Sequence, residues 1–194
     1  MSERIKIVVF AGSSREGSLN KKLVRASIPY LEASGAEVQF VDLKNYSLPI
    51  FDEDDENEKG LPPLVRELKD IFISADGFLI SSPEYNGYFS GVFKNCIDWL
   101  SRKVEGYPPL ECFNGKTVGL LAASPGGMGG IRVLPHVRQL LSGLKMHVIP
   151  TQFGLGNASQ AFHDDCSLKD VKHQDTVKNL CDNLVAFTQA LKKC

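Results

Sequence analysis

The sequence has little of several features that would point to a particular class of function. Its 22 basic and 23 acidic side chains leave a net charge of −1, so charge gives no reason to expect nucleic acid or a membrane as a partner. No apolar run is long enough to span a bilayer, and the run that ends at Gly12 is too short for a signal peptide. The five cysteines form no CxxC pair and have no histidine at metal-ligand spacing, which argues against a zinc site or a disulfide framework. We therefore expect a cytoplasmic protein with reduced thiols and no metal site.

Two kinds of apolar pattern alternate along the chain. Short apolar runs, typical of buried strands, cover residues 5–11, 36–43, 76–82, 116–123 and 145–149. Apolar residues at helical spacing cover residues 18–35, 64–71, 88–100, 131–141 and 168–191. This alternation implies right-handed βαβ crossovers and a parallel sheet with helices on both faces. The length suits one domain, so the sequence predicts a single α/β three-layer sandwich over residues 1–194.

A few other features have plain structural interpretations. The acidic run 52–58 fails the EF-hand pattern, because Asn57 occupies the glycine position, and is expected to be a solvated loop. Trp99 is expected to pack in the core, and Arg102 to cap its helix or reach a neighbouring subunit. His136 is expected at the surface or in an interface rather than as a ligand. Gly143 is expected to stop a helix.

The loop after the first strand, residues 12–20 (GSSREGSLN), is rich in hydroxyls and opens onto a helix. In an open parallel sheet the ligand lies beyond the carboxyl ends of the strands, so this loop is a candidate anion site, with Arg15 as its charged donor. An N-cap at Ser18 beside an ordinary turn would explain the same hydroxyls. Ser18 and Leu19 stand where a Walker A loop needs Lys and Ser/Thr, and Ser14 replaces the second glycine of a dinucleotide fingerprint. The loop therefore fits a mononucleotide phosphate better than ATP, GTP or a dinucleotide.

Two further loops suit a flat ligand. Residues 83–87 (PEYNG) follow the third strand and offer backbone N–H groups, an amide and an aromatic ring. An ordinary turn would explain the proline, asparagine and glycine there, but it would not explain Tyr85. Residues 124–130 (SPGGMGG) follow the fourth strand and carry so little side chain that a planar ligand could lie on the backbone, although simple flexibility is the alternative.

Three segments, residues 12–20, 82–102 and 123–141, together resemble the NADPH-dependent FMN reductase family, particularly its chromate reductase and soluble quinone reductase branch. The resemblance implies a flavodoxin-like fold with strand order 2-1-3-4-5, FMN as cofactor and NADPH or NADH as co-substrate. It also implies a homodimer or homotetramer. One departure is Ser90, where relatives usually have proline, and this leaves the rim of the ring pocket undefined.

Carried over by position, the resemblance implies cofactor-binding residues in all three loops. Those of the phosphate loop are Ser13, Arg15, Ser18, Leu19 and Asn20; those along the isoalloxazine are Pro83, Glu84, Tyr85, Asn86 and Gly87; those on its other side are Ser124, Pro125, Gly126 and Gly127.

The activity implied is transfer of hydride from NAD(P)H to FMN, and then of two electrons to a quinone, metal oxyanion, azo compound or flavin. The flavin carries this chemistry, so no catalytic side chain is predicted. A flavodoxin-type electron carrier is the main alternative, although such carriers are usually strongly acidic and this chain is not. A phospho-acceptor or hydrolase is disfavoured because Asp42 and Asp76 do not cluster and no Ser, His and Asp set stands out.

Overall fold

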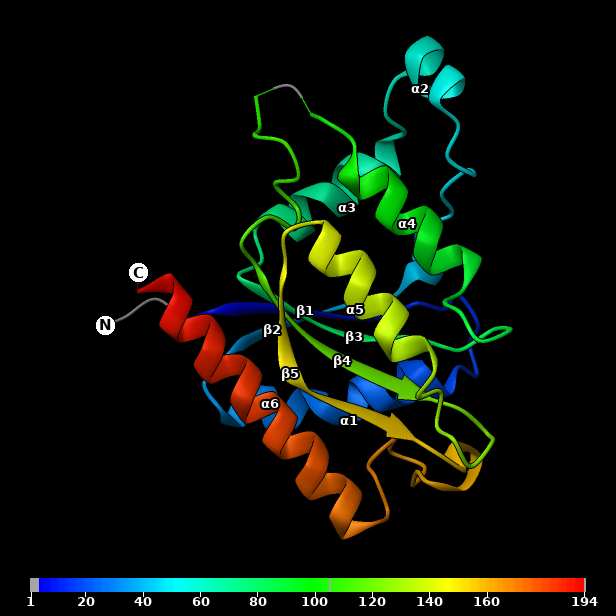
Figure 1. The fold of residues 1–194 in the computed structure, drawn as a ribbon, viewed down its shortest axis with the longest axis vertical. Helices are drawn as coiled ribbons and strands as arrows, with labels where there is room; N and C mark the ends of the chain where they lie inside the picture. Colours follow the sequence, from blue (N-terminus) through cyan, green and yellow to red (C-terminus); the bar gives the residue numbers. More distant parts are fainter. Residues whose placement is uncertain (1–3, 105, 194) are drawn as a thin grey trace.

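The five strands form one parallel sheet in the order β2-β1-β3-β4-β5 (Figure 1). The computed structural model describes residues 4–104 and 106–193. The strands are β1 (Lys6–Ala11), β2 (Glu37–Val41), β3 (Gly77–Ser81), β4 (Thr117–Ala123) and β5 (His147–Leu155). Val9 of β1 is in register with Phe40 of β2 on one side and with Leu79 of β3 on the other. The predicted fold and strand order are confirmed, and the order reverses between β1 and β3.

Helices cover both faces of the sheet. One face carries α1 (Leu19–Ala33) and α6 (Val171–Lys192), and the other carries α3 (Pro63–Ile73), α4 (Gly91–Ser101) and α5 (Val133–Gly143) (Figure 1). The sheet has a hydrophobic core on each face, and alternate side chains of β1 point into the two cores. Val8 and Phe10 pack with α3 and α4, whereas Ile7 and Val9 pack with α1 and α6. Burial on both faces explains why this strand is a continuous apolar run. Two short 3-10 turns, η1 (Leu43–Asn45) and η2 (Ala158–Gln160), lie in the connections.

The last strand is longer than the sequence predicts. The prediction ended it at Ile149, but β5 runs to Leu155 with an irregularity in its pairing to β4. Leu120 of β4 pairs with Gln152, whereas Val118 pairs with Val148, so β5 carries the extra residues around Pro150. An edge strand with a bulge tolerates a proline that would break a central strand, and the proline therefore concealed this continuation.

Two helix boundaries also differ from the prediction. Tyr88 and Phe89 precede α4, because the side chain of Ser90 caps that helix. Gly143 is still helical in α5, and the residue with left-handed backbone is Lys145, at φ 65°. Trp99 is buried as predicted and donates its indole N–H to the carbonyl of Pro49 over 2.8 Å.

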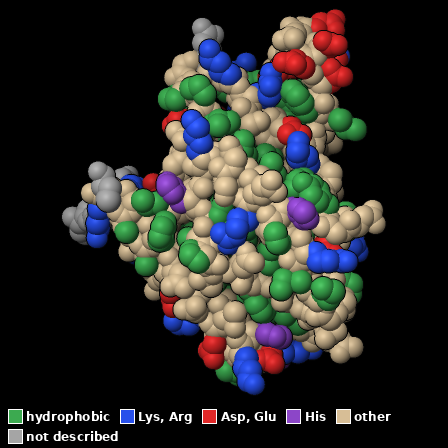
Figure 2. Space-filling model, viewed as in Figure 1, with side chains coloured by type: hydrophobic (Ala, Val, Ile, Leu, Met, Phe, Trp, Pro, Cys, Tyr) green, Lys and Arg blue, Asp and Glu red, His purple; other side chains and the backbone are tan. Residues whose placement is uncertain are grey.

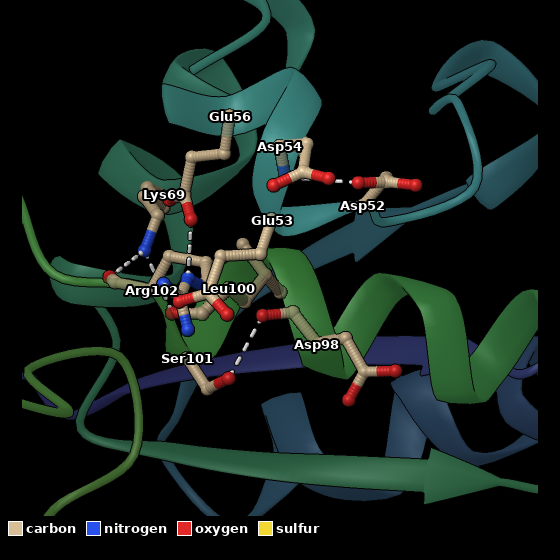
Figure 3. A network of polar contacts seen from close by, with 9 residues as sticks. All are labelled: Asp52, Glu53, Asp54, Glu56, Lys69, Asp98, Leu100, Ser101 and Arg102. Atoms are coloured by element: carbon tan, nitrogen blue, oxygen red, sulfur yellow. Dashed lines mark hydrogen bonds and ion pairs between the residues drawn. The ribbon is translucent and has the colours of Figure 1, made fainter. Parts of the chain in front are cut away.

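The prediction of a loop at residues 52–58 was wrong, because a short helix, α2 (Glu53–Lys59), forms there. Asp52 accepts from the backbone N–H of Asp54 at 2.9 Å, and acidic residues fill the first turn, where the helix dipole favours them. No residue of α2 is buried, and its acidic side chains gather on a projection from the body (Figure 2). Arg102, at the end of α4, donates its Nε–H to Glu56 over 2.6 Å (Figure 3). This ion pair joins the projection to the sheet layers.

Within the described ranges, no helix is long and apolar enough to cross a membrane. Nor do the same ranges contain a group of three or more His, Cys, Asp or Glu side chains placed to hold a metal ion.

Candidate functional site

The loop after β1 brings buried hydroxyls and one exposed cation to the carboxyl edge of the sheet. Ser13 and Ser18 are buried, whereas the Arg15 side chain is exposed. Ser18 is the N-cap of α1 and accepts from the N–H of Lys21 at 3.4 Å. The N-cap interpretation of Ser18 is thus correct, and it is compatible with anion binding. The N–H groups of Leu19 and Asn20, in the first turn of α1, have no partner within the helix and are available to an anion.

The side chain of Asn20 joins the start of α1 to the sheet, in addition to the phosphate contact predicted for this residue. Its amide donates to the carbonyl of Ala123 at 3.0 Å, and its oxygen accepts from Ser81 Oγ at 2.7 Å and from the N–H of Ala123 at 2.9 Å. These bonds tie the start of α1 to the ends of β3 and β4. The amide oxygen thus accepts two bonds and the NH2 donates one within the chain, and the backbone N–H of Asn20 is a further donor that an anion could use.

The turn after β3 is a tight hairpin. Tyr85 and Tyr88 exchange two backbone hydrogen bonds of 2.8 and 3.0 Å. Between them, Asn86 has φ 53° and Gly87 has φ 80°, the positive values that a type I′ turn requires at both central positions. This geometry explains the Asn-Gly pair. The ring of Tyr85 is half-exposed, whereas the equally half-exposed ring of Tyr88 packs against His136, with 4.4 Å between the ring centroids.

Glu84 forms an ion pair that sequence spacing did not reveal. Arg132, just before α5, donates its Nε–H to Glu84 Oε1 over 2.7 Å, and its Nη2 lies against the same oxygen. Glu84 Oε2 is buried and has no hydrogen-bond partner in the described chain. Arg132 was not predicted as a site residue, and only its position directly after the glycine-rich loop could have suggested it.

The glycine-rich loop after β4 packs against the end of β5. A Cβ atom on Gly129 would lie 2.7 Å from the backbone of Gly154, and one on Gly156 would lie 2.3 Å from the carbonyl oxygen of Gly127. Contacts this short require glycine, so close packing of two backbones explains the composition of this loop better than flexibility does. Ser124 Oγ accepts from the N–H of Gly126 at 3.1 Å and braces the start of the loop.

One cleft joins the three loops. It encloses about 80 Å³, and its lining residues are Ser13, Arg15, Ser18, Leu19, Asn20, Pro83, Glu84, Tyr85, Ala123, Ser124 and Pro125. Typical small-molecule sites measure about 300–1,000 Å³, so a bound mononucleotide would be enclosed in part, with the rest at the open rim. Ala123 was not predicted. The predicted residues Asn86, Gly87, Gly126 and Gly127 do not line this cleft, and they shape the loops around it.

The aspartates of the hydrolase alternative lie apart. Asp42, at the carboxyl end of β2, is 2.5 Å from Lys21 Nζ. Asp76 precedes β3 at the opposite edge of the sheet, where it accepts from the N–H of Lys6 at 2.8 Å. The structure therefore holds Asp42 and Asp76 at opposite edges of the sheet, each with a lysine partner.

Comparison with known proteins agrees with this geometry. Residues 5–160 match the family described as "NADPH-dependent FMN reductase". The chain belongs to the NADPH-dependent FMN reductase family. It is an oxidoreductase whose cofactors are FMN and NAD(P)H.

Relatives and solved structures cover nearly the whole chain. An NAD(P)H-dependent FMN reductase of Pseudomonas aeruginosa is 32% identical over 99% of this chain and 100% of its own length. A quinone reductase of Escherichia coli K12 is 33% identical over 100% of this chain and 98% of its own. The NAD(P)H:(acceptor) oxidoreductase FerB of Paracoccus denitrificans superposes with a TM-score of 0.82 at 25% identity, covering 96% of this chain and 98% of that one. The implied family and the flavodoxin-like fold are thus confirmed.

The residues of the cleft fit FMN. A dianionic phosphate suits the two free N–H groups at the start of α1 together with Arg15. Pro83, Ser124 and Pro125 line the same cleft and leave room for a flat ring beside the phosphate donors. The half-exposed Tyr85 offers an aromatic face at the same rim.

Proposed function

We propose that this chain passes two electrons from NAD(P)H, through FMN held in the cleft between the loops after β1, β3 and β4, to a small quinone-type acceptor. The observation that carries the proposal is the convergence of Ser13, Arg15 and Ser18 with Glu84, Tyr85 and Ser124 around one cleft. These residues come from three loops that are far apart in the sequence. Their meeting at the point where the strand order reverses is the arrangement that open α/β sheets use for nucleotides.

The residues of the chain bind and orient the cofactor. Arg15, with the N–H groups of Leu19 and Asn20, would hold the phosphate, and the bonds of Asn20 to β3 and β4 keep these donors in place. Pro83, Glu84 and Tyr85 would lie along the isoalloxazine on one side, with Ser124 and Pro125 on the other. FMN supplies the chemistry, accepting a hydride and releasing two electrons. No side chain has to act as acid, base or nucleophile.

The acceptor is proposed to be a quinone because several relatives carry that name, including the Escherichia coli quinone reductase. The cleft suits a planar, apolar molecule, since the half-exposed Tyr85 lines it and Met128, on the glycine-rich loop after β4, is exposed. An open rim of this kind would also admit an azo compound, a metal oxyanion or a free flavin, which therefore belong in the same substrate screen.

We also propose that residues 1–194 form one FMN-binding domain that assembles as a homodimer or homotetramer in the cytoplasm. A groove of about 520 Å³ between α4 and α5, lined by Tyr88, Phe89, His136 and Leu140 among others, offers an apolar face to a second copy. The thiols of Cys96, Cys112, Cys166 and Cys181 are free, which suits a reducing compartment. Light scattering of the purified protein tests the assembly, and a monomeric mass would contradict it.

An absorbance spectrum before and after anaerobic NADPH tests the activity. The expected result is oxidised flavin bands that bleach within seconds of adding NADPH and recover when a quinone follows. Bound flavin that neither NADPH nor NADH reduces would favour the flavodoxin-type carrier instead. A protein that retains no flavin and rebinds none would contradict both the reductase and the flavodoxin-type carrier.

A further inference from the structure

A second cavity shares the loop after β1 with the cofactor cleft. Ser13 and Arg15 line the cleft, whereas Ser14, between them in the sequence, lines a cavity of about 190 Å³ that extends to η1 and α4. Phe10 of β1 is in register with Val41 of β2, so the loops after these two strands leave the sheet side by side. The cavity therefore lies at the carboxyl edge of the sheet, next to the place proposed for the FMN phosphate.

The walls of this cavity combine apolar surface with a cation. Leu48 and Val92 supply apolar surface, and Ser14, Ser47 and Lys44 supply two hydroxyls and an ammonium group. Apolar surface with a few polar groups suits a flat ring such as a purine, and an ammonium beside hydroxyls suits a phosphate. The lining therefore matches a phosphorylated nucleoside.

Lys44 is held by a partner that a ligand can displace. Its ammonium is paired with the carboxylate of Glu16, and the two side chains are 48% and 83% exposed. The bond to Lys44 lowers the pKa of Glu16, so this carboxylate is ionised at neutral pH. Exposed ion pairs of this kind are weak, and each partner is therefore free to exchange the other for a ligand group.

The adenosine end of NAD(P)H needs a place outside the cofactor cleft. A cleft of about 80 Å³ at the FMN site cannot also enclose a whole dinucleotide. The groove between α4 and α5 is larger, but its cation, Lys94, is held by both carboxylate oxygens of Asp98, at 2.6 and 2.8 Å. Lys44, whose partner is an exposed and flexible side chain, is the more available of the two cations.

We propose that the cavity between the loop after β1, η1 and α4 holds the adenosine end of the nicotinamide cosubstrate, with Lys44 binding the 2′-phosphate of NADPH and Glu16 accepting the free 2′-hydroxyl of NADH. This inference rests on the proposed function and adds the means by which the cosubstrate is selected. Dinucleotide sites use the same chemistry, in which a carboxylate accepts the ribose hydroxyl and a nearby cation accommodates the 2′-phosphate. Here the two groups are each other's partner until a cosubstrate binds.

The first test compares flavin reduction by NADPH and by NADH in the FMN-loaded protein. Anaerobic stopped-flow absorbance gives a second-order rate constant for each donor, and the ratio of the two requires no saturation. In Lys44→Met the rate constant with NADPH is expected to fall by about tenfold or more, because a charge-assisted hydrogen bond to the 2′-phosphate is lost. The rate constant with NADH should change by less than about twofold, since NADH has no group for Lys44 to bind.

Glu16→Gln is expected to shift the ratio in the opposite direction. The neutral amide neither competes for Lys44 as strongly nor repels the 2′-phosphate, and it is a weaker acceptor for the 2′-hydroxyl of NADH. The NADPH-to-NADH ratio should therefore rise by about three- to tenfold. The matched control is Lys178→Met, which removes an exposed lysine paired with Asp182 on α6 and should leave the ratio unchanged.

The second test asks whether the adenosine occupies this cavity. Ser47→Trp places a large ring at the exposed wall and should slow reduction by both NADPH and NADH by about tenfold, because the ring obstructs the adenosine. Reduced nicotinamide mononucleotide, which lacks the adenosine, should reduce this variant and the wild type alike. Calorimetry with adenosine 2′,5′-bisphosphate gives a measurement without turnover, in which Lys44→Met should bind at least about tenfold more weakly than the wild type.

Failure of this inference and failure of the proposed function give different results. The inference is overturned if Lys44→Met keeps the wild-type NADPH-to-NADH ratio, if it binds the bisphosphate as the wild type does, or if Ser47→Trp slows all three donors equally. The proposed function would still stand in those cases. If neither NADPH nor NADH reduces the flavin of the wild-type protein, the proposed function itself fails.

Discussion

The hydroxyl of Ser90 donates to the carbonyl of Gly12 over 2.6 Å and ties the start of α4 to the loop after β1. The same oxygen accepts from the N–H of Phe93 at 3.1 Å, so one buried side chain caps α4 and braces the phosphate loop. Alanine or proline at this position would have no hydroxyl for either bond. Ser90 therefore fixes the start of α4 and the loop after β1 together.

Replacing Ser90 with alanine should destabilise the protein by about 1–2 kcal/mol, because the cap is lost and the Gly12 carbonyl loses a buried donor. Urea denaturation measures the change. The matched control is Ser101→Ala at the other end of α4, where the hydroxyl bonds only to the carbonyl of Asp98 in its own helix. An equal loss of stability in the two variants would show that Ser90 has no special role.

Arg15→Ala should weaken FMN binding by about ten- to a hundredfold or more, because one charge-assisted hydrogen bond contributes roughly 1.5–3 kcal/mol. Fluorescence titration with FMN measures the effect. Riboflavin, which lacks the phosphate, should bind the variant and the wild type alike. Arg66→Ala, an exposed arginine on α3, is the control for loss of charge alone. Unchanged FMN affinity in Arg15→Ala would count against the phosphate site.

Asn20→Ala should cost about 2–4 kcal/mol in the free energy of unfolding, because it leaves the Ser81 hydroxyl and both backbone groups of Ala123 without their partner. Chemical denaturation without added flavin isolates this structural role. In the control, Asn183→Ala, the lost bond is an exposed one to Thr151, and the change should stay within about 0.5 kcal/mol. A small effect at Asn20 would mean that the three bonds do not hold the strand ends together.

The sequence was sufficient for the sheet because short runs rich in β-branched residues, such as β1 with Gly12 directly after it, are too short for a buried helix and are typical of a buried strand. It was insufficient where local signals conflict with context. Pro150 concealed the continuation of β5, and the charge of residues 52–58 concealed a helix whose start is capped by Asp52 and whose acidic first turn suits the helix dipole.

Some residues of the candidate site were likewise predictable from the sequence, and others were not. Ser13, Arg15 and Ser18 were predictable because a hydroxyl-rich loop before a helix has a direct physical use. The pairing of Glu84 with Arg132 was not, since the two residues are 48 positions apart and only the packing of α5 against the sheet brings them together.

The buried thiols should make stability fall at alkaline pH. Burial raises the pKa of Cys96 and Cys181 to about 12, from 9.0 for a free thiol. Between these values the unfolded chain loses protons that the folded chain keeps, so the contribution to stability is complete below pH 9 and declines as the pH rises. Cys181→Ala should therefore lose less stability than the wild type between about pH 8 and pH 10.5 in urea denaturation. Cys166→Ser, at a partly exposed thiol, should follow the wild type, and parallel curves for all three proteins would refute the assignment.

Arg102→Ala should loosen α2 without unfolding the rest of the protein. A helix of this length is not stable alone, and α2 buries no side chain, so its order depends on the Arg102 contacts with Glu56 and with the ring of Phe51, 5.0 Å away. Even a fully exposed ion pair contributes about 0.2–1 kcal/mol, and a cation–π contact contributes a similar amount, so amide hydrogen exchange in residues 53–59 should accelerate roughly three- to tenfold. Lys59→Ala, which removes only the exposed pair with Asp55, should leave that exchange nearly unchanged. Equal exchange in Arg102→Ala and the wild type would show that α2 is held by its own caps and not by its link to α4.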